Sequence, residues 1–243
     1  MTSQEGSSVH QPLRKLTLTG SPYDRGIKHG DTFAEEIETN LEIYLDTFEH
    51  KGTDRDVVYE QAERFMPLIE SENEAYAEEM RGVADGSGRS IEEITILNAR
   101  YEVMYSAFKT ATEEMGVTNP DACTAYAVRN TRSANGHTYL GQNWDWMPGL
   151  ETFVMDVRSE DCLDHVAMTE AGIVGGKIGV NEAGLGMTLN GLITENDGKE
   201  PFRKPYHVRF REILNSERMD SAIGSLIADD RVCSANVILA HES

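Results

Sequence analysis

Apolar side chains recur at every third or fourth position through much of the first half of the chain. Residues 32–48 alternate such positions with glutamates, which is typical of an amphipathic helix with one face toward a core. A second helix is predicted to begin at a cap on Thr53 or Asp54, with its apolar stripe interrupted at Pro67. These segments predict a mainly helical first half.

Two further signals complete this half. Ser90 and Glu93 have the spacing of a capping box, so a third long helix is predicted from Ser90 through Phe108. Residues 1–12 are polar and are predicted to be disordered. A short strand over residues 13–19 should follow them.

After Pro120 the spacing of apolar positions changes from near four to two, which is typical of strands. Strands are predicted at 124–128, 137–142, 151–157 and 234–243, with a hairpin over 177–192. Helical spacing returns over residues 206–228. No internal repeat and no linker divides the chain, so the order of helices, strands, helices and a last strand predicts one α+β layered unit.

The charge balance narrows the expected partners. The chain has 42 acidic and 22 basic residues, a formal net charge of −20, and only seven of the basic residues are lysine. Such a surface repels phosphate backbones and anionic lipids, so neither nucleic acid nor a membrane is an expected partner. The acidity fits simple solubility, and the scarcity of lysine also fits a halophilic protein. With no long apolar run, the sequence predicts a soluble cytoplasmic protein.

Several familiar motifs are incomplete in this sequence. The cysteines, Cys123, Cys162 and Cys233, include no C-x-x-C pair, so neither a disulfide framework nor a structural zinc site is expected. Residues 172–178 imitate a phosphate-binding loop but lack its glycine spacing and its final Ser or Thr. The histidines are scattered. We therefore expect no metal and no cofactor.

Cys123 stands out among the thiols because of its neighbours. It follows the polar turn 119–122, begins a predicted strand and is preceded by small Ala122. On a tight turn its sulfur could attack the Ala122–Cys123 peptide bond, giving a thioester that water cleaves and leaving Cys123 as a new N-terminus. The freed α-amine has an ordinary pKa of about 7.7 to 8.0, beside a thiol of about 8.5. One residue would then supply both base and nucleophile.

Other readings of Cys123 stay open from the residues alone. A lone cysteine at the start of a strand is more often a small buried apolar side chain. A simple thiol enzyme, with His137 or His165 as its base, would be active without chain cleavage.

Four blocks of sequence resemble one known family, in the right order. They are GSPYDRGIKHG at 20–30, EEMRGVADGSGRSIEEITILNARYE at 78–102, DACTAYAV at 121–128 followed by GQNWDW at 141–146, and TEAGIVGGKIGVNEAGLGMTLNGL at 169–192. Along nearly its whole length the chain resembles the isopenicillin-N acyltransferase-like family, whose members are autoprocessed N-terminal-nucleophile hydrolases.

The resemblance implies a four-layer αββα sandwich that is cleaved between Ala122 and Cys123. The two segments would stay associated as one structural unit after cleavage. Residues 1–122 would form a mainly helical α-chain, and residues 123–243 a β-chain with core strands and two helices.

The resemblance also assigns roles to individual residues. Cys123 corresponds to the nucleophile, and Asp145 to the aspartate that orients the new α-amine and favours its protonated form. A turn or cap is the alternative role for Asp145. Asn143 and Trp144 would shape the site. Asn190 corresponds to an asparagine near the acyl pocket, where it could donate to an oxyanion or equally satisfy backbone groups.

Two features depart from the family pattern. Ala122 stands where the family usually has glycine, which restricts the strained conformations open to the scissile bond and would slow cleavage. The family chain also continues past the strand at 234–243 and there carries an asparagine that completes the oxyanion hole. The chain is therefore interpreted as truncated: a fragment, one of two polypeptides, or a degenerate relative whose last strand is an open sheet edge.

The function expected from these observations is that of an amide hydrolase or acyltransferase. A small acylated substrate, an amide or thioester, would form an acyl-enzyme on Cys123, and water or an amine would accept the acyl group. The alternative is a non-catalytic or incomplete relative that acts as a binding or assembly partner.

Overall fold

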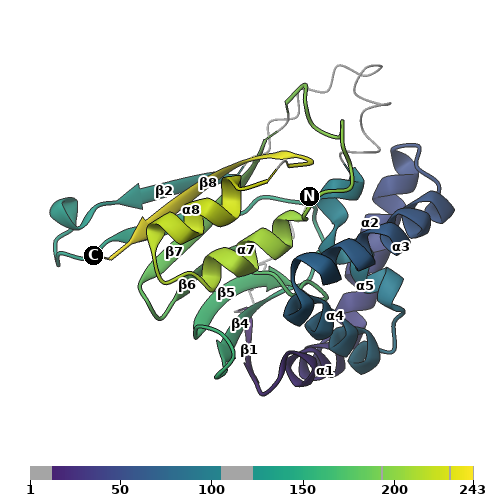
Figure 1. The fold of residues 1–243 in the computed structure, drawn as a ribbon, viewed down its shortest axis with the longest axis horizontal. Coiled ribbons are helices and arrows are strands. Elements are labelled where there is room, and N and C mark those ends of the chain that lie inside the picture. The colour runs from purple at the N-terminus through teal and green to yellow at the C-terminus, as the bar shows by residue number, and fades with distance from the viewer. Residues whose placement is uncertain (1–12, 105–122, 193, 230, 243) are drawn as a thin grey trace, which may run out of the picture.

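The computed structural model describes residues 13–104, 123–192, 194–229 and 231–242 (Figure 1). Three predictions fall outside these residues: disorder over 1–12, the helix beyond Met104, and the placement of Ala122. The first half contains β1 (Arg14–Thr19), α1 (Pro22–Thr32), α2 (Ala34–His50), α3 (Arg55–Glu72), α4 (Glu74–Ser87) and α5 (Ile91–Asn98).

The helical predictions for this half are largely confirmed. Helices α2 and α3 match the two apolar stripes, and α3 continues through Pro67 rather than ending there. The predicted capping box of Ser90 and Glu93 closes the start of α5. The long third helix is wrong in one respect, because α5 ends at Asn98 and a turn at Ala99 separates it from helical residues 100–104.

Helix α1 was missed by the hydrophobic pattern, because its buried face is built from glycine. Gly26 in α1 and Gly82 in α4 let the two backbones meet. A Cβ on Gly26 would lie 2.1 Å from the carbonyl oxygen of Glu79, and one on Gly82 would lie 2.3 Å from that of Tyr23. No other residue fits such a crossing, so the glycines replace the apolar stripe that usually marks a packed helix.

The second half contains most of the strands. They are β2 (Thr124–Val128), β3 (Tyr139–Asn143), β4 (Thr152–Arg158), β5 (His165–Glu170), β6 (Ile178–Asn181), β7 (Leu185–Leu192) and β8 (Ser234–His241), with a short 3₁₀ turn η1 (Asn130–Arg132) and the helices α7 (Tyr206–Leu214) and α8 (Met219–Ile227). The predicted hairpin is β6–β7, and the predicted helical region 206–228 is two helices. Strand β5 was missed because polar His165, Thr169 and Glu170 are buried within it and break the apolar alternation.

The strands form a six-stranded sheet in the order β1-β4-β5-β6-β7-β8 and a separate two-stranded sheet, β2–β3. Strands β1 and β4 are parallel, and the other neighbours are antiparallel. Among the described strands β8 pairs only with β7, so it lies at an edge of the sheet as the sequence predicted.

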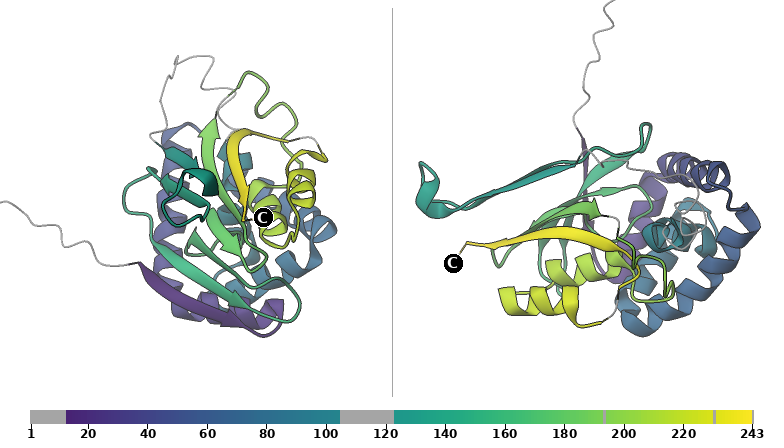
Figure 2. Two further views of the ribbon diagram at one scale, coloured as in Figure 1. Left: turned by 90° about the vertical axis from the view of Figure 1, so that its left-hand side faces the viewer. Right: turned by 90° about the horizontal axis from the view of Figure 1, so that it is seen from above.

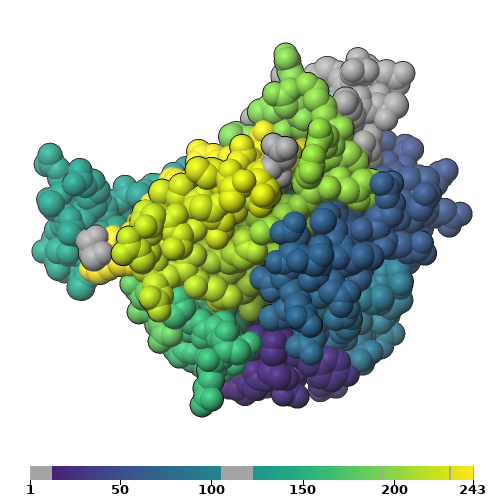
Figure 3. Space-filling model, in the orientation of Figure 1, coloured from purple at the N-terminus to yellow at the C-terminus, as the bar shows by residue number. Residues whose placement is uncertain are grey.

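The two-stranded sheet β2–β3, hereafter the ribbon, covers one face of the large sheet. Helices α7 and α8 cover the opposite face. Helices α1 to α5 form a group beside the sheet, next to β1 (Figures 1 and 2). A Cβ on Gly186 of β7 would lie 2.9 Å from Leu140 of the ribbon, whereas one on Gly179 of β6 would lie 3.1 Å from Leu214 of α7. The tip of the ribbon projects past the helices (Figure 3).

This mixed arrangement of helices and sheets agrees with the predicted α+β class. The complete four-layer sandwich and the truncation stay predictions. Within the described residues, no helix combines the length and apolar character needed to cross a membrane.

Candidate active site

The side chain of Gln142 in β3 bonds the ribbon to β7 of the large sheet. Strand β6 pairs with β7 only as far as Met187, which leaves the next backbone groups of β7 without a strand partner on that side. The side chain of Gln142 acts as the missing partner. Its Oε1 accepts from the Leu189 N–H at 2.8 Å, and its Nε2 donates to the Leu189 carbonyl oxygen. Because Asn143 pairs with Thr124, this contact also sets the position of the residue before β2, Cys123.

The structure brings together Cys123, Asp145 and Asn190, the three predicted catalytic residues. The Cys123 sulfur donates to the backbone carbonyl of Asp145 across 3.5 Å. Asn190 Nδ2 donates to the Cys123 carbonyl oxygen at 2.9 Å, and its buried Oδ1 has no hydrogen-bond partner among the described residues. Asn190 thus satisfies a backbone group in this form of the chain, which is one of the two roles predicted for it.

The Asn-Trp-Asp-Trp segment alternates between solvent and protein. Asn143 and Asp145 are exposed, whereas Trp144 and Trp146 are half-buried. Trp146 Nε1 donates to the hydroxyl of Tyr44 at 3.0 Å, which ties this segment to α2. The predicted site-shaping role fits Trp144, whose ring lies toward a buried lysine described below.

A buried cluster of charged side chains lies beside these residues, and the sequence analysis did not identify it. Glu170 at the end of β5 accepts from Arg100 at 2.8 Å and forms an ion pair with Lys177 at 2.9 Å. The hydroxyl of Tyr44 donates to the other carboxylate oxygen at 2.7 Å. We call Arg100, Glu170 and Lys177 the site cluster. Its two cations face one carboxylate, so it carries an excess of positive charge.

Aromatic rings enclose the site cluster. The Arg100 guanidinium lies 4.0 Å from the ring centre of Tyr101. The Lys177 ammonium lies 5.6 Å from the same ring and 5.5 Å from the ring of Trp144. Contacts of this kind favour a cation that has lost its water. Trp144 therefore joins the cluster to the strand end that holds Cys123.

Electrostatics shift the pKa values of this cluster. Burial and the charge of Arg100 lower the pKa of Lys177 to about 7, and Glu170 and Cys123 oppose that shift. Burial would raise the pKa of Glu170, but Arg100 and Lys177 outweigh it and hold that pKa below its usual value. Burial, Lys177 and Arg100 hold the pKa of His207 well below its ordinary value, so its ring is neutral at pH 7.

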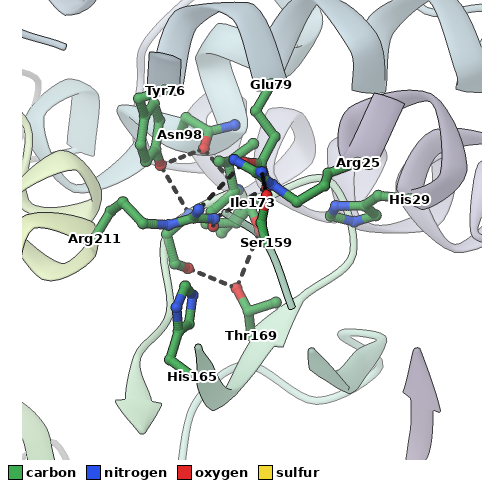
Figure 4. Close-up of polar contacts among 12 residues, drawn as sticks. Arg25, His29, Tyr76, Glu79, Asn98, Ser159, His165, Thr169, Ile173 and Arg211 are labelled. Atoms are coloured by element: carbon green, nitrogen blue, oxygen red, sulfur yellow. Dashed lines mark hydrogen bonds and ion pairs between the residues drawn. The ribbon is translucent and has the colours of Figure 1, made fainter. Parts of the chain in front are cut away.

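The loop that leads into Lys177 is held by side chains from the helices (Figure 4). His29 Nε2 accepts from the Gly172 N–H, Asn98 Oδ1 from the Val174 N–H and the Tyr76 hydroxyl from the Gly175 N–H, each at 3.0 Å. These N–H groups are therefore not free to bind phosphate, in agreement with the exclusion of a phosphate-binding loop. Their role is to fix the backbone before Lys177.

The histidines of the simple thiol-enzyme alternative lie elsewhere. His137 pairs with Glu242 and lies just before β3, whereas Cys123 adjoins the other end of β3. The two ends of this strand are about 13 Å apart at the usual rise per residue. His165 is at the start of β5, and burial lowers its pKa to about 3, followed by the charge of Arg211. Neither is placed as a base for Cys123.

The other two thiols are in different surroundings. Cys233 is buried, and burial raises its pKa well above the ordinary value. Cys162 is partly buried, and burial raises its pKa as well. Both thiols are therefore protonated at neutral pH and poor nucleophiles.

A cavity of about 460 Å³ lies between the ribbon and the large sheet. Its lining is mainly apolar side chains and glycine, including Leu140 of the ribbon, Ile178 of β6 and Met187 of β7. The cavity adjoins the end of the ribbon opposite Cys123.

Comparison with known proteins gives a similarity to an acyltransferase. No protein-family model matches the sequence. The chain is 27% identical over 234 residues to the 40 kDa form of acyl-coenzyme A:6-aminopenicillanic-acid-acyltransferase from Emericella nidulans. The aligned region covers 94% of this chain and 61% of the relative, so the chain spans about three fifths of the length of that protein. This similarity supports the relationship to isopenicillin-N acyltransferases that the sequence motifs predicted.

Proposed function

We propose that this chain is an autoprocessed N-terminal-cysteine acyltransferase or amidohydrolase. The observation that carries the proposal is the meeting of Cys123, Asp145 and Asn190 at the end of the ribbon, through the contacts of 3.5 and 2.9 Å described above. The similarity to a protein named as an acyltransferase points to the same chemistry.

Each of the three residues has a role in the proposed reaction. Cleavage before Cys123 frees an α-amine on the residue that carries the thiol. The amine takes up the thiol proton, and the sulfur attacks the carbonyl carbon of an amide or thioester. The Asp145 carboxylate favours the protonated amine by its charge.

Asn190 is able to serve both halves of this site. In the uncut chain its Nδ2 donates to the Cys123 carbonyl, and its buried Oδ1 accepts no hydrogen bond from the part of the chain that the structure describes. A new ammonium group on Cys123 is a donor that would satisfy this oxygen. Donation from Nδ2 to an oxyanion would require its present bond to be exchanged.

The acyl group of the substrate is proposed to lie between the ribbon and the large sheet. The cavity there has the apolar lining that a hydrocarbon chain requires. Because the cavity adjoins the end of the ribbon opposite Cys123, the acyl chain would have to follow the ribbon to place its carbonyl at Cys123. The acceptor, water or an amine, decides between hydrolysis and transfer.

Intact-mass measurement of the purified chain, together with a denaturing gel, tests the proposal. We expect two pieces that divide between Ala122 and Cys123. Cys123→Ala should stay uncut and should lack amidase and thioesterase activity toward simple acyl amides and acyl thioesters. Cys162→Ser is the matched control, because it removes a thiol outside the site and should be cut like the wild type.

The opposite outcomes separate the alternatives. A Cys123→Ala variant with undiminished turnover would exclude the assigned nucleophile. An uncut wild-type chain whose thiols also resist alkylation would favour the binding or assembly partner. Turnover by a wild-type chain that is never cut would favour a simple thiol enzyme.

A further inference from the structure

The uncleaved chain has a chemical problem that the proposed function does not solve. Before cleavage the nitrogen of Cys123 belongs to a peptide bond and is not a base. The hydrogen bond from the thiol to the Asp145 backbone carbonyl orients the sulfur, but a backbone carbonyl is not a base that can remove the thiol proton. A carboxylate with an ordinary pKa of about 3.9 is a poor acceptor for a thiol of about 8.5. Self-cleavage therefore needs a different base.

Lys177 is placed to be that base. Its side chain is 1% exposed and its partner Glu170 is 0% exposed, so water does not screen the pair. Beyond its ion pair with Glu170 at 2.9 Å, the Lys177 Nζ has no hydrogen-bond partner among the described residues, so the neutral amine can take a proton from another group. The ring of Trp144, the residue before Asp145, lies 5.5 Å from the Lys177 Nζ. The charge of an ionised Cys123 thiol would raise the pKa of Lys177.

We propose that Lys177, held by Glu170, takes up the Cys123 thiol proton in the uncleaved chain and so promotes self-cleavage. This inference rests on the proposed function, since it assigns a base to its first step. After cleavage the α-amine of Cys123 takes over, and Lys177 is no longer needed as the base.

The step balances without any co-reactant except water. The thiol proton passes to the neutral amine of Lys177, directly or through one water. The sulfur forms a bond to the carbonyl carbon of Ala122, and the C–N bond breaks as the Cys123 nitrogen takes the proton back from Lys177. The products are a thioester and a free amine. Water then cleaves the thioester to an Ala122 carboxylate and a Cys123 thiol.

The surroundings of Lys177 adjust it for this task. The charged and titratable groups around it are Arg100 and Tyr101 of helical residues 100–104, Glu170 of β5 and His207 of α7, and the charge of an ionised Cys123 would add a smaller effect. Burial and the charge of Arg100 lower the pKa of Lys177, so the ammonium can lose its proton near neutral pH. The carboxylate of Glu170 raises this pKa and keeps the protonated form accessible. The resulting pKa of about 7 lies near neutral pH, where a base exchanges protons most effectively.

The test follows self-cleavage after refolding the full chain from denaturant, by intact mass, between pH 5.5 and 9. The wild-type rate should rise about tenfold between pH 6 and pH 8 and then level, as for a base with a pKa near 7. Lys177→Met and Lys177→Arg should cleave at least about 100-fold more slowly. The arginine variant retains the cation but cannot release its proton. Lys204→Met, which removes a lysine paired with Glu72 and Glu212, is the matched control and should cleave normally.

Several outcomes would overturn the inference. Cleavage of Lys177→Arg within a few-fold of the wild type, with an unchanged pH profile, would exclude Lys177 as the base while leaving the proposed function intact. If circular dichroism shows that neither variant folds, the wild-type profile decides, and an inflection only above pH 8 would assign the step to the thiol alone. A wild-type chain that stays uncut at every pH would contradict the proposed function itself and this step with it.

Discussion

Two buried ion clusters hold the same molecule together but differ in their charge balance. The first, the balanced network, joins α1, α4 and α7 through Arg25, Glu79 and Arg211 (Figure 4). Its second carboxylate is the partly exposed Asp161, which pairs with Arg25, so two cations face two carboxylates. The second is the site cluster, in which Arg100 and Lys177 share Glu170 alone. A balanced cluster can remain ionised at any pH near neutrality. In the unbalanced cluster Lys177 loses its proton easily. This cluster is the one that lies near the proposed nucleophile, Cys123.

Removal of one carboxylate from each cluster gives the largest expected effects. Glu79→Gln leaves two buried arginines without their shared partner and should lower the free energy of unfolding by about 3–5 kcal/mol. Glu170→Gln also leaves the buried Arg100 without its carboxylate and should cost a similar amount at pH 6, but the part due to Lys177 should disappear as the pH rises through 7, because Lys177 can release its proton.

Urea unfolding at pH 6 and pH 8 measures the difference. Glu70→Gln, which breaks the exposed pair with Arg81, is the control and should change stability by less than about 1 kcal/mol. A loss for Glu170→Gln that is the same at pH 6 and at pH 8 would contradict the distinction between the two clusters.

The close crossing of α1 and α4 is the geometric origin of the balanced network, because it brings Arg25 to Glu79. Gly82→Ala would place a methyl group 2.3 Å from the Tyr23 carbonyl oxygen and should destabilise the fold by about 3 kcal/mol. Gly224→Ala in α8 is the control, since nothing lies within 4 Å of its Cβ position, and it should stabilise by up to about 1 kcal/mol. Thermal melting of both variants would refute this explanation if they behaved alike.

Lowering the pH should destabilise the fold through three buried histidines that form no ion pair in either cluster. Burial, followed by the charge of Arg211, lowers the pKa of His29 and His165 to about 3, and the pKa of His207 is also well below its ordinary value of 6.5. Between pH 6.5 and 3 the unfolded chain therefore binds more protons than the folded one, and stability falls as the pH falls.

Glu102 works in the opposite direction, because burial raises its pKa to about 7, but it is one group against three. We expect the melting temperature to fall by on the order of 10 °C between pH 6.5 and pH 4.5. His207→Phe should reduce that fall, since neither ring nitrogen has a hydrogen-bond partner to lose. A melting temperature that is constant over this range would contradict the neutral state of these histidines.

Salt should have the smallest effect and should act on the surface rather than on the clusters. With a net charge of −20, the exposed carboxylates repel one another, and KCl screens that repulsion. The melting temperature should rise by a few degrees as KCl approaches molar concentration. The rise should be the same in Glu79→Gln, because buried pairs are hardly screened. A flat or falling midpoint would leave solubility as the only explanation for the acidity.

The sequence predicted the parts of this molecule that depend on local patterns. The helices α2 and α3, the capping box at Ser90 and the β6–β7 hairpin followed from spacing and turn residues. Cys123 was singled out by its neighbours in the sequence, and Asp145 and Asn190 were assigned by the resemblance to a known family. In the structure Cys123 contacts the backbone of Asp145 and the side chain of Asn190, and the catalytic roles of the three residues remain a proposal.

What the sequence did not reveal depends on contacts between distant residues. Arg100 and Glu170 are 70 positions apart, and only the fold brings them to Lys177. A lysine inside the apolar, glycine-rich run before β6, in a chain with few lysines, was the available signal. Helix α1 was hidden for the same reason, since the glycines that bury it have meaning only when α4 is opposite.

The support beneath Cys123 has a consequence for what a chain break would do. A newly made terminus ordinarily frays, because its first residues lose the neighbour that held them. Here the carbonyl of Cys123 is bonded to Asn190, and the following residue is paired across the ribbon with Asn143. The residue would therefore keep its place after losing its predecessor, and the same anchoring could serve both the maturation of the chain and every later turnover.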